Sequence, residues 1–95
     1  MIYPLYEGLP LVPSRSVAIE LYNNNLMLRD ILDILEHGYD CAKSKRKKGT
    51  IERCMDHKRK TTKVVIAKSY NYSLDSEAWV LIHVGVITKH RRVKK

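Results

Sequence analysis

Residues 77–88, EAWVLIHVGVIT, decide the fold, because they form the most apolar strand-like run of the chain. Side chains alternate between the two faces of a strand, and here every second one is aliphatic. These aliphatic positions are Ala78, Val80, Ile82, Val84 and Val86. We therefore predict a strand that turns this set toward the core. The opposite set, which includes Trp79 and His83, is expected on a face that is open or covered only by the N-terminal arm.

Two more strands are predicted before this one, over residues 50–57 and 61–70. The polar residues 57–60 form the turn between them. Asn, Ser and Asp at positions 71–76 are typical of the turn that leads into the closing strand. Because each connection is short, we expect the three strands to form an antiparallel meander.

A helical period replaces this alternation earlier in the chain. The apolar residues spaced along one helical face are Leu28, Ile31, Leu32 and Leu35. They predict a helix over residues 26–37, ended by Gly38. A shorter helix is expected at 15–22, with Ser14 as its N-cap. The predicted fold is therefore α+β, with two N-terminal helices packed on a three-stranded antiparallel β-meander.

The length of 95 residues predicts a single domain, 1–95, and excludes a TIM barrel or a full dinucleotide-binding fold. Three prolines in residues 1–13 predict a loose N-terminal arm, and residues 89–95 a basic C-terminal tail. No apolar run is long enough to span a membrane. The arm lacks the basic start of a signal peptide, so a cytoplasmic location is expected.

Positive charge is concentrated in two segments. Residues 43–63 hold ten Lys/Arg against two acidic residues, and the tail 89–95 holds five Lys/Arg with no acidic residue. The rest of the chain has three Lys/Arg and eight acidic residues, although the whole carries a net charge of +8. Charge clustered in this way predicts RNA or another polyanion as partner. The alternative is a solubilising surface.

Twelve of the predicted functional side chains follow from this charge pattern or from nearby aromatic residues. Cations contact phosphates, and tyrosines can stack on unpaired bases. The predicted nucleic-acid-binding residues are Lys43, Lys45, Arg46, Lys47, Lys48, Lys58, Arg59, Lys60, Tyr72, Arg91 and Arg92. Tyr70 can also stack, although a tyrosine at a strand end can equally anchor its turn.

A helix-helix-hairpin-strand pattern runs from Val17 to Ile87. Its features are a short helix with a small residue at Ala18, and a second helix that ends in Leu35-Glu36-His37-Gly38. In this pattern the chain resembles the small prokaryotic family called domain of unknown function 4258. More distantly, it is similar to the RelE and BrnT toxins, small basic ribonucleases or their relatives. The resemblance implies a RelE-like fold and RNA as substrate, and toxins of this type have an antitoxin partner.

His83 stands out as a histidine in the middle of an aliphatic strand. Metal-independent RNA cleavage needs a base for the 2′-hydroxyl, an acid for the leaving oxygen and cations for the phosphorane. A catalytic set of His83, Arg53, Lys63 and Tyr70 would meet these needs. The competing interpretation is a half-buried histidine that bonds a neighbour.

The cysteines are expected to be reduced thiols, as in most cytoplasmic proteins. Cys54 and His57 have a C-x-x-H spacing. Cys41 and His83 lie too far away in the sequence to form the second close pair of ligands that a structural zinc site needs. We expect neither metal nor cofactor. A Cys41–Cys54 disulfide would require the ends of the basic segment to meet.

Three functions remain open from the sequence. The first is an RNA-binding module that uses residues 43–63 and the tail. The second is a toxin-type endoribonuclease, and the third is a domain that binds an acidic, antitoxin-like protein. A membrane partner is not expected, and an exposed edge strand would permit a homodimer.

Overall fold

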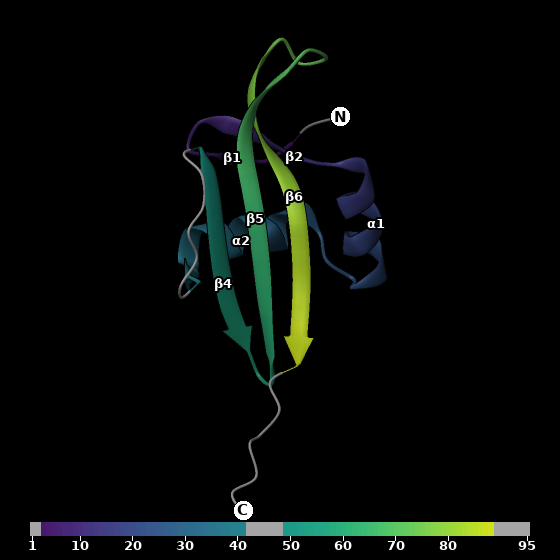
Figure 1. Ribbon diagram of the computed structural model, residues 1–95, viewed down its shortest axis with the longest axis vertical. Helices are drawn as coiled ribbons and strands as arrows, with labels where there is room; N and C mark the ends of the chain where they lie inside the picture. Colours follow the sequence, from purple (N-terminus) through teal and green to yellow (C-terminus); the bar gives the residue numbers. More distant parts are fainter. Residues whose placement is uncertain (1–2, 42–48, 89–95) are drawn as a thin grey trace, which may run out of the picture.

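The computed structural model describes residues 3–41 and 49–88, which form two helices and one mixed sheet (Figure 1). The helices are α1 (Arg15–Asn23) and α2 (Leu28–His37). The strands are β1 (Leu5–Tyr6), β2 (Leu9–Pro13), β3 (Tyr39–Asp40), β4 (Thr50–His57), β5 (Lys60–Asn71) and β6 (Ser76–Thr88). Across the sheet their order is β1-β2-β6-β5-β4-β3.

The predicted three-stranded antiparallel meander is wrong, because the sheet has six strands and is mixed. β4, β5 and β6 are antiparallel neighbours at its centre. β3 extends the sheet beyond β4, and β2 pairs with β6 in the parallel direction. The extra strands are short, between two and five residues, so no long hydrophobic alternation marks them in the sequence.

The N-terminal segment is not a loose arm in this structure. Leu11 pairs with Trp79 and Pro13 with Leu81, and Leu11 is completely buried. Prolines are tolerated in such a strand where their missing N–H is not needed by a neighbour. Ser14 N–H continues the pairing by donating to the carbonyl of Leu81 at 3.0 Å. The segment therefore supplies part of the sheet and part of the core.

The two faces of β6 do not follow the predicted alternation. Val65 pairs with His83 while Ile66 pairs with Leu81, so Ile82 is an extra residue, as in a β-bulge. Before the bulge, Trp79 and Leu81 join the core, and after it Val84 does so. Ile82 itself is 46% exposed. The prediction that one uninterrupted set from Ala78 to Val86 faces the core is wrong, because one inserted residue reverses the parity of the strand.

Both helices bury their apolar stripes against the same face of the sheet. α1 contributes Val17 and Leu21, and α2 contributes Ile31, Ile34 and Leu35. Figure 1 shows α2 crossing behind the strands, while α1 lies beside β6. Neither helix is long and apolar enough to cross a bilayer, a finding that covers the described ranges.

Cys41 and Cys54 form a disulfide, so the expectation of two reduced thiols is not met. The pairing of Tyr39 with Cys54 brings the chain after α2 back to β4, and Cys41 follows two residues later. The disulfide therefore joins the end of the segment after α2 to the middle of β4. Residues 42–48 themselves lie outside the described part of the chain.

The burial of Leu11 leads to a direct test of the role of β2. We expect Leu11→Ala to lower the free energy of unfolding by about 2–5 kcal/mol, because it empties a fully buried site. Leu5→Ala, at a position that is 60% exposed on neighbouring β1, is the matched control and should change it by no more than about 0.5 kcal/mol. Chemical denaturation of both variants measures the difference. Equal, small effects would mean that the segment does not belong to the core.

Candidate functional site

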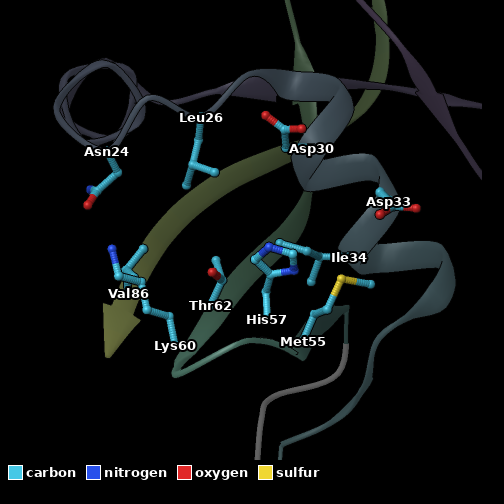
Figure 2. Close-up of a pocket in the computed structure, with 10 residues that line it drawn as sticks. All are labelled: Asn24, Leu26, Asp30, Asp33, Ile34, Met55, His57, Lys60, Thr62 and Val86. Carbon is cyan, nitrogen blue, oxygen red and sulfur yellow. The ribbon is translucent and has the colours of Figure 1, made fainter. Parts of the chain in front are cut away.

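A cavity of about 360 Å³ opens between α2 and the end of the sheet where β4 turns into β5 (Figure 2). We call it the α2–sheet cavity. Its lining combines apolar side chains with carboxylates, an imidazole, an amine, an amide and a hydroxyl. The lining residues are Asn24, Leu26, Asp30, Asp33, Ile34, Met55, His57, Lys60, Thr62 and Val86. Pockets of about 300–1,000 Å³ with this mixed character are typical of small-ligand sites.

The spacing of the secondary structure explains how these side chains converge. Asp30, Asp33 and Ile34 lie three and four residues apart on α2, so they share one side of the helix. Met55 and His57 alternate on β4 and therefore share the face that looks toward α2. The register pairs Met55 with Thr62 and His57 with Lys60, which brings β5 side chains to the same face.

The two carboxylates that α2 contributes to the cavity make different local contacts. Asp30 caps its helix, since its Oδ2 accepts a hydrogen bond from the Met27 N–H at 2.8 Å. Asp33 Oδ1 lies 3.7 Å from His37 Nε2, beyond the usual length of a hydrogen bond. The side chain of Asp33 is 59% exposed. Asp33 is therefore the carboxylate with more freedom to bind a ligand.

The turn between β4 and β5 presents a cluster of cations beside the cavity. We call His57, Lys58, Arg59 and Lys60 the basic turn, and these residues line a second hollow of about 460 Å³. All of them are exposed. Lys58, Arg59 and Lys60 form no ion pair with any residue of the described ranges. The cations are therefore available to an anionic partner.

A close backbone contact at the far end of α2 holds the helix against β4. A Cβ atom on Gly38 would lie 2.4 Å from the Cys54 carbonyl oxygen and 2.5 Å from that of Ile34. Arg53 reinforces the junction, because its Nη2 donates to the Gly38 carbonyl at 2.6 Å. Its Nη1 donates to Asp40 Oδ1 at 2.8 Å. This junction determines how far α2 lies from the strand that carries Met55 and His57.

Of the predicted catalytic set, the structure brings together His83 and Lys63. Both lie on the sheet face opposite the helices. The His83 imidazole lies over Gly85, since a Cβ there would be 3.2 Å from His83 Nε2, and Gly85 pairs with Lys63. Lys63 Nζ forms a 2.6 Å ion pair with Glu52, whose side chain is only 3% exposed. A largely buried carboxylate thus holds the Lys63 ammonium.

The other two residues of the set lie elsewhere. Arg53 is on the helix-facing side of β4, where its guanidinium donates hydrogen bonds to the Gly38 carbonyl and to Asp40. Tyr70 is five residues along β5 from Val65, the partner of His83, or about 16 Å at the usual rise of a strand. Its hydroxyl donates to Asp75, and this hydrogen bond raises the pKa of Tyr70 above its ordinary value of 10.0. A tyrosine held in its protonated form is a poor general base at neutral pH.

The predicted nucleic-acid-binding residues that the structure describes lie at the two ends of the β5–β6 hairpin. Lys58, Arg59 and Lys60 form the basic turn. Tyr72 packs edge-to-face on Tyr70 at the opposite end of the β5–β6 hairpin, with ring centroids 4.9 Å apart. The predictions that fall outside the described residues are Lys43, Lys45, Arg46, Lys47, Lys48, Arg91 and Arg92.

Sequence reasoning did not single out Asp30, Asp33 or His57 as ligand-binding residues. His57 falls in the polar turn 57–60, and the two aspartates face the basic turn across the α2–sheet cavity. The spacing of Asp30, Asp33 and Ile34 contained the signal, because this side of α2 borders the buried stripe. Which strand end it would meet depends on the tertiary packing.

Within the described ranges, no cluster of His, Cys, Asp and Glu side chains could hold a metal ion. Cys54, one half of the C-x-x-H spacing, is bonded to Cys41 instead. Comparison with models of protein families, with curated proteins and with solved structures found no match to this chain.

The Gly38 junction is open to a test with two matched substitutions. We expect Gly38→Ala to lower the free energy of unfolding by about 1–3 kcal/mol, because the new methyl group meets two backbone carbonyls that cannot rotate away. In a domain of this size each kcal/mol corresponds to about 4–8 °C in Tm. Gly85→Ala meets only the movable His83 ring and should leave Tm nearly unchanged. Thermal unfolding compares them, and equal effects would contradict the tight junction.

Proposed function

We propose that this chain is an RNA-binding module whose described contact surface is the basic turn beside the α2–sheet cavity. The observation that carries the proposal is the set of exposed cations at one end of the sheet, without ion-pair partners in the described part of the chain. Phosphates neutralise such cations and release counterions, which makes binding favourable at low salt. The cavity next to them offers room for a part of the RNA that carries no charge.

The backbone of the basic turn adds independent support. Lys58 has φ 57°, in the left-handed region that is costly for residues other than glycine. Glycine would relieve this cost at a two-residue hairpin turn. A lysine at such a position keeps a cation at the tip of the turn, at the expense of stability. Glu7, Asn25 and Asp75 have similar φ values at other turns, so the support lies in the cation that this turn keeps at its tip.

The basic segments outside the described residues extend the same proposal. Thr88 pairs with Lys60, so the chain passes the basic turn immediately before the cationic residues 89–95 of the sequence. Residues 43–48 contribute five more cations to the charge of the chain. Their contact with RNA stays a prediction.

The other two functions receive less support from the described geometry. Of the predicted catalytic set, an endoribonuclease built on His83 would have Lys63 on the same face, because Arg53 and Tyr70 lie elsewhere. An acidic protein could bind the same cations, and residues 85–88 of β6 pair only with β5 among the described strands, which leaves an edge for another chain. Neither alternative uses the α2–sheet cavity, so RNA binding is the stronger proposal.

Removing two cations of the basic turn tests the proposal. In K58G/R59S, the glycine relieves the backbone cost, so Tm should be equal to or higher than that of the parent chain. RNA affinity should fall, and the slope of log K against log salt should become shallower by about 1.4, at about 0.7 for each lost phosphate contact on a single strand. Fluorescence anisotropy with a labelled single-stranded RNA over a salt series measures both.

The matched control, R15S/R29S, removes the same charge from exposed positions on α1 and α2. Its slope should stay close to that of the parent chain. Equal changes in the two double variants would mean that net charge alone acts, and the assignment to the basic turn would fail. If the RNA in these samples is cleaved, and H83A abolishes the cleavage, the endoribonuclease would replace the binding module.

A further inference from the structure

We propose that the α2–sheet cavity takes one unpaired guanine base of the bound RNA, with the Asp33 carboxylate as the acceptor for its Watson–Crick edge. This inference rests on the proposed RNA binding and adds to it a choice of base. The basic turn by itself contacts phosphates, which carry no sequence information. A cavity that admits a base can supply this sequence information.

The size and lining of the cavity fit a single planar ring system. Its volume of about 360 Å³ lies near the lower end of small-ligand pockets, so a base fits and a base pair within a duplex does not. Leu26, Ile34, Met55 and Val86 supply apolar surface for the faces of the ring. The His57 imidazole, which Figure 2 shows among these side chains, adds a ring on which a base can stack.

The charges around the cavity determine which part of a nucleotide enters. Lys60 belongs both to the cavity and to the basic turn, so a cation lies at one side. Asp30 and Asp33 of α2 stand at the other side, as Figure 2 shows. The carboxylates repel phosphate, whereas the cations attract it. A nucleotide therefore fits with its phosphate on the basic turn and its base toward α2.

The carboxylates also discriminate among bases. An ionised carboxylate only accepts hydrogen bonds, and its two oxygens match two parallel N–H donors. Guanine presents two adjacent donors, N1–H and the 2-amino group, on its Watson–Crick edge. Adenine and cytosine place a ring acceptor beside their amino group, and uracil flanks its N–H with two carbonyl oxygens. Because Asp30 already caps α2, the freer Asp33 is the acceptor that we assign to guanine.

The test uses nonamer RNAs, U4GU4 and U4AU4, with the full-length chain. We expect the parent chain to bind U4GU4 at least about fivefold more tightly, near the lower limit for discrimination by a bidentate pair. In D33N the amide replaces one acceptor by a donor, so the ratio should fall to about one. Anisotropy at a single moderate salt concentration gives the ratios, and thermal unfolding checks that the exposed substitution leaves the fold intact.

Glu36→Gln is the matched control, because Glu36 is an exposed carboxylate on the same helix that also lies near His37 but does not line the cavity. It removes the same charge and should keep the guanine preference. If the parent chain binds both RNAs equally, the guanine inference is overturned while RNA binding stands. A preference that persists in D33N overturns the assignment to Asp33. If neither RNA binds at low salt, the proposed function itself fails.

Discussion

The approach of Gly38 to the carbonyl of Cys54 is the constraint on which the site depends. No side chain fits between these two backbones, so α2 ends directly against β4. The Arg53 guanidinium then ties the Gly38 carbonyl to Asp40, and the next residue, Cys41, is bonded to Cys54. With one end of the helix pinned in this way, α2 crosses behind the strands (Figure 1), and its buried stripe packs on the core. The α2–sheet cavity lies between this helix and the last residues of β4.

A second feature of the sheet is that the thirteen-residue strand β6 buries residues on both sides of its bulge. β2 covers the first part of β6, and Leu11 completes the core there. The bulge at Ile82 then turns Val84 inward and His83 outward. Because of this reversal, His83 joins Lys63 and Glu52 on the face away from the helices. Within the described ranges, polar side chains thus gather on both faces of the sheet, and the site beside α2 combines a cavity with the basic turn at its edge.

The sequence predicted those parts of the fold that depend on local periodicity. The stripe of Leu28, Ile31 and Leu35 located α2 to within two residues, and the β-rich runs located β4, β5 and β6 closely. The strands β1, β2 and β3 were missed, because they are short and are stabilised by partners far away in the chain. In the candidate site, the charge pattern pointed to the basic turn. It could not reveal that Asp33 and His57 share a cavity, since their meeting depends on the packing of α2 against β4.

The disulfide also changes what a break in the chain would do. Cys41 and Cys54 close a covalent ring that includes the lysine-rich residues 43–48. A single cut of a peptide bond inside this ring therefore releases no fragment. Both helices would stay covalently attached to the long hairpin through the two sulfur atoms, and the molecule would keep its mass apart from one added water. Only a reducing agent would separate the two pieces. While the disulfide is intact, the two parts of the molecule therefore stay joined even if the chain is cut within residues 43–48.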